Sequence, residues 1–144
     1  MNRRRTFLLL LLVVAAGLAS RLLHTGTPLL DKYPGDALYA VMVFLLLRLV
    51  FTRADSARLI AAAAAVMLGL ELFQLTDIPL GWSRHAALPV RLAGRLLGTA
   101  FSWLDLLAYA AGLAAAWTLG RFSADTAGAA SVRGGRLFSN SRQK

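Results

Sequence analysis

The stretch LIAAAAAVMLGLELFQL, residues 59–75, decides the fold because it is apolar except near its end. A hydrocarbon core about 30 Å thick needs about 20 mostly apolar helical residues, and shorter spans are tolerated at some cost. The two polar residues of the stretch, Glu71 and Gln74, are spaced i,i+3 and so share one face of a helix. The stretch therefore predicts a transmembrane helix with a polar end.

Three further apolar stretches lie at residues 6–23, about 36–51 and 101–119. The chain has 144 residues, enough for one domain, and 58% of them are hydrophobic. A soluble protein of this size could not enclose so much apolar surface, whereas a bilayer covers it. We therefore expect an all-α membrane protein, with a four-transmembrane-helix bundle over residues 1–122. The composition of residues 123–144, which are rich in Ser, Gly and Arg, predicts a disordered cytoplasmic tail.

The loop at residues 76–100, between the third and fourth spans, is less apolar than the spans. The segment Pro79–Trp82 predicts a turn followed by an aromatic residue at the interface. From Pro89 to Leu97 we expect a short interfacial or re-entrant helix with Arg91 and Arg95 on one face. Gly94 and Gly98 form a GxxxG motif, which favours close helix packing.

Basic residues are divided unequally between the two sides of the predicted bundle. With strict alternation of the spans, one side carries eleven basic and two acidic residues, and the other carries five of each. Basic residues bias a segment toward the cytoplasm, so both ends of the chain are predicted to be cytoplasmic. The net charge of +9 is explained by this distribution, and nucleic acid is not expected as a partner.

The first span has two alternative interpretations. Arg3–Arg5 before a leucine-rich run that ends at Ser20 has the parts of a cleaved signal peptide, and Arg4–Leu8 is similar to a twin-arginine export signal. Three more apolar spans follow, and the run is long enough to cross the membrane, which favours a retained helix. Cleavage would leave three spans.

Polar residues gather where four span ends should meet at the outer side of the membrane. We call the following residues the polar cluster: Arg21, Asp36, Tyr39, Glu71, Gln74, Asp105 and Tyr109. Asp105, Tyr109 and Gly112 also form one helical stripe, which should face the interior because an unpaired carboxylate in lipid is costly. The expected partners of the carboxylates are Arg21, Arg91 and Arg95. The alternatives are that the cluster only joins the helices or that the two loop arginines bind an anionic group.

Separate motifs at the span ends support a family resemblance. They are Ser20–Arg21, Lys32–Ala40, Glu71–Gln74, and Leu97–Tyr109 with Gly112. With these motifs, over roughly residues 6–119, the chain resembles the small bacterial membrane proteins grouped as domain of unknown function 2809. The resemblance implies a bacterial cytoplasmic (inner) membrane and implies no activity.

The chain also resembles, more loosely, the VanZ-like proteins, which are linked to glycopeptide resistance and envelope processes. The residues that correspond are Glu71, Gln74, Arg91, Asp105 and Gly112, while Tyr109 stands where those proteins usually have Asn. This departure means that shared chemistry does not follow from the resemblance, which implies only a role facing the cell envelope.

Three functions compete at this stage. The first is a binding protein for the headgroup of a lipid or lipid-linked envelope precursor, held by the polar cluster with Arg91 and Arg95. The second is a structural subunit of a membrane complex, with another membrane protein as partner. The third is an interfacial lipid-modifying enzyme with Glu71 or Asp105 as general base, which the sequence favours least because no nucleophile or metal-ligand set accompanies them. No cofactor and no metal site are expected, since His24 and His85 lack ligand spacing and the chain has no cysteine.

Overall fold

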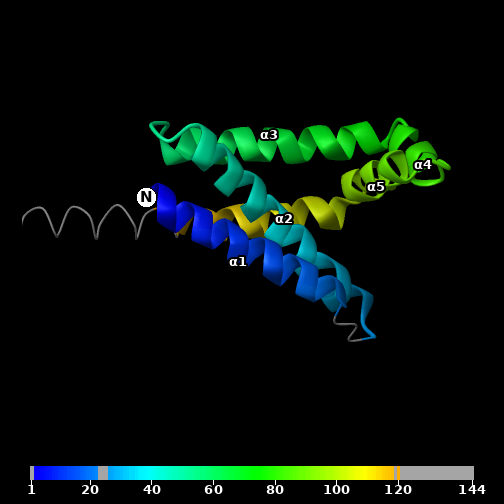
Figure 1. Cartoon of the computed structure of the whole chain (residues 1–144), viewed down its shortest axis with the longest axis horizontal. Coiled ribbons are helices and arrows are strands. Elements are labelled where there is room, and N and C mark those ends of the chain that lie inside the picture. Colours follow the sequence, from blue (N-terminus) through cyan, green and yellow to red (C-terminus); the bar gives the residue numbers. More distant parts are fainter. Residues whose placement is uncertain (1, 23–25, 119, 121–144) are drawn as a thin grey trace, which may run out of the picture.

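The computed structural model describes residues 2–22, 26–118 and 120, without the side chains of residues 21, 22 and 28–31. All regular secondary structure in this described part is helical, which confirms the all-α prediction. Along the chain the helices are α1 (Arg3–Leu22), α2 (Pro28–Val50), α3 (Ser56–Gln74), α4 (Ile78–Ser83), α5 (Leu88–Leu97) and a last helix at 103–118 (Figure 1). The predicted tail at 123–144 lies outside the described residues.

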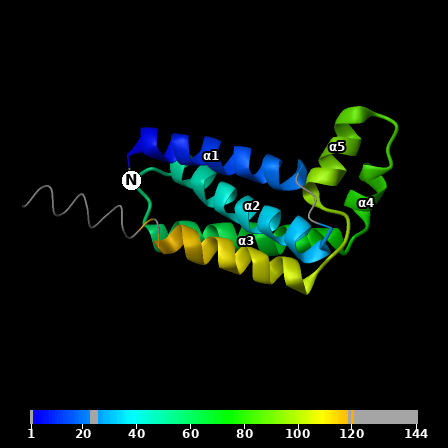
Figure 2. The same ribbon diagram turned by 90° about the horizontal axis from the view of Figure 1, so that it is seen from below.

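The four long helices run side by side, while α4 and α5 lie across one end of them (Figure 2). At this end, which we call the α5 end, α1 and α3 finish and α2 and the 103–118 helix begin. The opposite end, which we call the arginine end, carries the start of α1 with Arg3, Arg4 and Arg5. Each long helix therefore reverses the direction of the one before it.

The core is formed mainly by α2, α3 and the 103–118 helix. Its largest members are Phe44 from α2, Met67 from α3 and Tyr109 from the 103–118 helix, and Leu9, Leu10 and Val13 of α1 pack against it. On α3 one stripe faces inward, at intervals of three or four residues. It begins with Leu59, Ala63 and Met67 and ends with Glu71 and Gln74. The same face is thus apolar at the arginine end and polar at the α5 end.

Within the described residues, two helical stretches are long and apolar enough to cross a membrane, namely Lys32–Val50 and Ser56–Gln74. Only 33% and 22% of these stretches are enclosed by the rest of the protein. A core helix of a soluble protein would be mostly enclosed. Large apolar side chains are instead exposed along the outside, among them Leu8 and Leu12 of α1, Val50 of α2 and Leu72 of α3. Exposed apolar surface of this kind favours contact with a membrane or with a partner protein.

Three of the long helices begin before the predicted spans, and α1 does so by three residues, at Arg3. Helix α2 was expected to begin near Asp36 and begins at Pro28, where a proline suits the first turn because its missing N–H has no helical partner there. Pro34 lies inside the helix. Helix α3 begins at Ser56, three residues earlier than predicted, because the Asp55 side chain caps it by accepting a hydrogen bond of 3.0 Å from the N–H of Ala57.

The turn predicted at Pro79–Trp82 is also wrong, because these residues form helix α4. Pro79 stands in its first turn, and Asp77 precedes it with φ of 57°. The helix predicted at Pro89–Leu97 is confirmed as α5. Helices α4 and α5 pack closely, since a Cβ at Gly94 would overlap backbone atoms of α4. The close packing predicted for the GxxxG motif is therefore present at Gly94.

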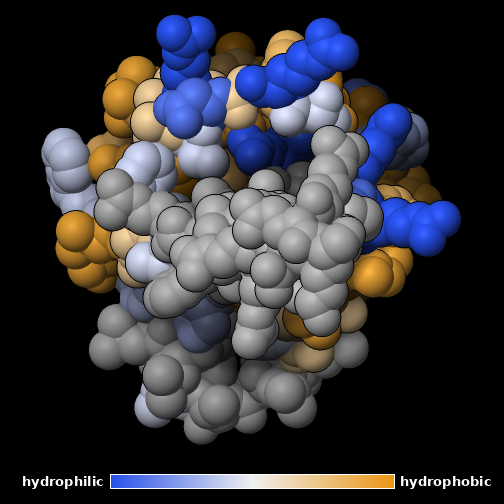
Figure 3. Space-filling model, turned by 90° about the vertical axis from the view of Figure 1, so that its left-hand side faces the viewer, coloured by the Kyte–Doolittle hydropathy of each residue, from blue (hydrophilic) through white to orange (hydrophobic). Residues whose placement is uncertain are grey.

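Hydrophilic side chains gather at the arginine end (Figure 3). The exposed arginines there lie at the start of α1, in the α2–α3 turn and in the first turn of α3: Arg3, Arg4, Arg5, Arg53 and Arg58. Arg48 is half-buried and donates a hydrogen bond of 2.7 Å from Nη1 to the Ala54 carbonyl, which closes that turn. The two ends therefore differ in chemistry: one exposes guanidinium groups, and the other encloses carboxylates.

Candidate functional site

Glu71 is the most deeply enclosed charged residue of the polar cluster, with 0% of its surface exposed. Its Oε1 accepts a hydrogen bond of 2.9 Å from the Tyr109 hydroxyl, and its Oε2 accepts one of 3.1 Å from the backbone N–H of Ser102. The first bond joins α3 to the 103–118 helix, and the second ties α3 to the segment that leads into that helix. Glu71 and Tyr109, from separate helices, therefore meet at one end, as the sequence predicts.

Asp105 lies one turn before Tyr109 on the same inward stripe and is only 5% exposed. Its two oxygens lie 2.6 and 2.7 Å from Nζ of Lys32, in the first two turns of α2. The lysine side chain is 50% exposed, so the ion pair reaches from the protein interior to its surface. Lys32 also lies 5.7 Å from the centre of the Tyr33 ring, a weak cation–π contact.

Gln74 connects the cluster to α5. Its Nε2 donates a hydrogen bond of 2.9 Å to the carbonyl of Leu97, the last residue of α5. Gly98 follows with φ of 83°, which favours glycine, and a Cβ there would displace the Gln74 amide. The carbonyl oxygen of Gln74 is enclosed and has no donor among the described residues. Gln74 therefore positions the end of α5 against α3.

Two further cluster residues are on α2. Asp36 is buried, one turn after Lys32 and beside Ala37, where α2 and the 103–118 helix approach closely. A Cβ at Gly112 would overlap the carbonyl oxygen of the neighbouring Ala37, so this approach requires glycine. Tyr39 is half-buried and packs against the apolar core, with no hydrogen bond to the rest of the cluster within the described part. The side chain of Arg21 lies outside the described residues.

The expected pairing of the carboxylates with Arg91 and Arg95 is wrong. Neither guanidinium forms an ion pair or hydrogen bond within the described residues. Arg91 is half-buried and Arg95 is exposed, one turn apart on α5. The carboxylates are occupied instead by Lys32, by the Tyr109 hydroxyl and by the Ser102 N–H.

Sequence reasoning missed three of these groups for physical reasons. Ser102 and Leu97 act through their backbone atoms, which side-chain identity does not reveal. Lys32 was assigned to a loop because α2 was expected to start after it. Its i,i+4 spacing from Asp36 is the signal that could have placed it on the helix, on the same face as the cluster.

The Lys32–Asp105 pair gives a first testable prediction. Replacing Lys32 with methionine leaves Asp105 enclosed without a cation, and we expect the free energy of unfolding to fall by about 1 kcal/mol, since the lysine is half-exposed and screened. Chemical denaturation in detergent measures this change. Adding Asp105→Asn to Lys32→Met should recover most of the loss, whereas Arg84→Met, which removes an exposed cation at the same end, should cost nothing. An equal loss in both single variants contradicts the pairing.

A family model described as "Protein of unknown function (DUF2809)" matches residues 26–113. The matched region begins after α1 and contains Lys32, Glu71, Arg91, Asp105 and Tyr109. No curated protein matches the chain, and no solved structure matches it either. The family model covers more than half of the chain and includes every element that forms the contacts of Glu71, Gln74 and Asp105. The chain belongs to the DUF2809 family.

Proposed function

We propose that this chain is a multi-pass membrane protein that binds the anionic headgroup of a lipid, or of a lipid-linked envelope precursor, at the α5 end. The single observation that carries the proposal is the pair of guanidiniums on α5, Arg91 and Arg95, which have no polar partner in the described part of the chain. Two guanidiniums one turn apart suit a phosphate or carboxylate in bidentate geometry.

The membrane arrangement in this proposal is a bundle of four transmembrane helices: α1, α2, α3 and the 103–118 helix. Their exposed apolar side chains support it, as do the two candidate spans, which are mostly unenclosed. The excess of basic residues at the arginine end favours a cytoplasmic location for that end and for both chain termini, in a bacterial inner membrane. The α5 end then lies at the outer leaflet.

The location of α5 supports a headgroup as ligand. The helix is strongly amphipathic, with Leu92 and Leu96 exposed beside the two arginines. A short helix of this kind lies in the membrane interface, with its apolar residues toward acyl chains and its charges at headgroup level. Trp82 of α4 is exposed next to it, and tryptophan favours the same depth. The resemblance to VanZ-like proteins is a further reason to expect an envelope ligand.

A structural role in a membrane complex is the second candidate. It is favoured by the enclosure of Glu71, whose two oxygens are both occupied by groups of this chain. This arrangement joins helices and needs no ligand. The same enclosure counts against Glu71 as a general base of a lipid-modifying enzyme, because a base must reach the proton that it removes.

Mass spectrometry of the lipids retained by the purified protein tests the proposal. The Arg91→Gln variant should retain less anionic lipid than the wild type, by about fivefold, because one arginine at an anionic surface contributes about 1 kcal/mol. Arg95→Gln should act in the same direction. The fold should persist in both, since neither arginine makes a polar contact with the described part of the protein.

Arg84→Gln is the matched control, since Arg84 is an exposed arginine that follows α4 at the same end. It removes the same charge and should leave the retained lipid unchanged. A protein whose retained lipids are identical in the wild type, Arg91→Gln and Arg95→Gln does not use α5 for a headgroup. The structural role would then be the better explanation of the polar cluster.

A further inference from the structure

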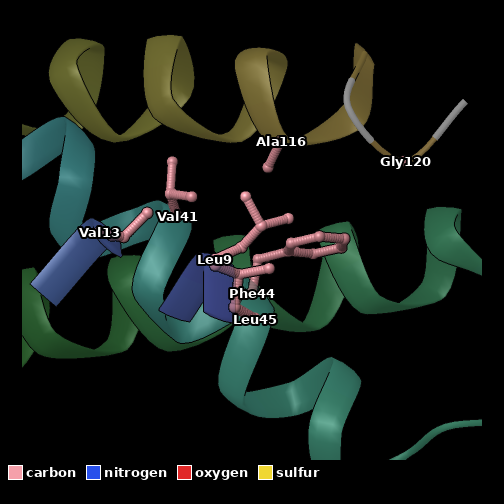
Figure 4. A pocket seen from close by; sticks show the side chains of 7 residues that line it. All are labelled: Leu9, Val13, Val41, Phe44, Leu45, Ala116 and Gly120. Atoms are coloured by element: carbon pink, nitrogen blue, oxygen red, sulfur yellow. The ribbon is translucent and has the colours of Figure 1, made fainter. Parts of the chain in front are cut away.

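A second feature lies near the opposite end of the protein, away from the polar cluster. Helices α1, α2 and the 103–118 helix leave a small, partly open cavity between them. Its lining is entirely apolar: Leu9, Val13, Val41, Phe44, Leu45, Ala116 and Gly120. Figure 4 shows Ala116 pointing toward the side chains of α2 across this space. We call it the apolar groove.

Two of the helices that line the apolar groove carry an arginine one turn nearer the arginine end. On α1, Arg5, Leu9 and Val13 are spaced four residues apart, so they form one stripe. Arg5 is exposed and has no polar partner among the described residues. On α2, Arg48 stands four residues after Phe44, and only one of its N–H groups is used by the Ala54 carbonyl.

An apolar groove with cations at one end matches a lipid with an anionic headgroup. We infer that the groove holds one acyl chain of an anionic phospholipid, with the phosphate at Arg5. An acyl chain is narrow and apolar along its length, as the lining is. The inference rests on the membrane insertion proposed above and on none of the residues of the α5 end.

Tryptophan fluorescence in vesicles that contain lipids brominated along the acyl chain tests this inference, because bromine quenches only at short range. Trp117 follows Ala116 of the groove, so the double variant Trp82→Phe/Trp103→Phe keeps a single reporter beside it. In phosphatidylcholine vesicles, a small fraction of brominated phosphatidylglycerol should quench Trp117 more strongly than the same fraction of brominated phosphatidylcholine. The affinities of the groove for the two lipids should differ by about fivefold, because one arginine contributes about that much to binding of the anionic lipid.

Substitutions in the variant that retains only Trp117 distinguish the contribution of the acyl chain to binding from that of the headgroup. Val13→Phe fills the groove and should abolish the excess quenching, whereas Val14→Phe, at the neighbouring and more exposed position, should preserve it. Arg5→Gln should reduce the preference for the anionic lipid about fivefold, and Arg4→Gln should not. Equal quenching by both lipids in the starting protein overturns the inference, and so does an excess that survives Val13→Phe.

A second reporter separates failure of the groove from failure of membrane insertion. Trp103 is 75% exposed on the outside of the 103–118 helix, and the double variant Trp82→Phe/Trp117→Phe keeps it alone. In an inserted protein, both brominated lipids should quench Trp103. Quenching of Trp103 without selective quenching of Trp117 rejects the groove alone. No quenching of Trp103 rejects both the insertion and the groove.

Discussion

Replacing Gly112 with alanine is expected to destabilise the protein by about 3 kcal/mol or more, although it adds a single methyl group. The new Cβ would overlap the carbonyl oxygen of Ala37, a backbone atom that cannot rotate away. Helix α2 and the 103–118 helix would have to separate. That movement would also pull Tyr109, one turn earlier on the same stripe, away from Glu71. Unfolding in detergent, followed by circular dichroism, measures the loss.

Gly69→Ala is the matched control for Gly112→Ala. Gly69 lies within α3, on the outside, and a Cβ there would meet nothing within 4 Å. Alanine has a higher helix propensity than glycine by about 1 kcal/mol, so this variant should be unchanged or slightly more stable. Equal behaviour of the two variants would show that α2 and the 103–118 helix are not in contact at Gly112.

Helical periodicity was enough to predict which residues share the interior of the polar cluster. Spacings of three and four residues place Glu71 with Gln74, and Asp105 with Tyr109 and Gly112, whatever the neighbouring helices do. The structure buries all five. Alternation of the spans then predicts that the two stripes meet at one end, and the Glu71–Tyr109 hydrogen bond confirms that they do. These features follow from the geometry of a helix and the order of the spans.

The partners of the carboxylates could not be predicted in the same way. They depend on where α2 starts, and Pro28 and Pro34 permit starts on either side of Lys32. They also depend on backbone groups at Leu97 and Ser102, whose positions are set by the conformation of the segment between α5 and the 103–118 helix. Arginine was assumed because it pairs best with carboxylates. Because α2 begins at Pro28, Lys32 lies on this helix, and it pairs with Asp105 in place of an arginine.

The Glu71–Tyr109 hydrogen bond gives the second large prediction. Glu71→Gln retains the size of the side chain but replaces one acceptor oxygen with a donor, so it cannot accept from both Tyr109 and Ser102. We expect the free energy of unfolding to fall by about 1 to 3 kcal/mol, because one enclosed donor is left unpaired. Tyr109→Phe should cost about 1 kcal/mol. Tyr39→Phe is its control and should cost much less, since no hydrogen bond within the described part involves the Tyr39 hydroxyl.

The double variant Glu71→Gln/Tyr109→Phe shows whether these effects come from the same interaction. Without the Tyr109 hydroxyl, the amide oxygen at position 71 is free to accept from Ser102, and its NH₂ group no longer faces a competing donor. The combined loss should therefore be smaller than the sum of the two, by about 0.6 to 1.7 kcal/mol, the range measured for hydrogen bonds between membrane helices. Losses that add fully would mean that Glu71 and Tyr109 act independently. The polar cluster would then not be the interaction that joins α3 to the 103–118 helix.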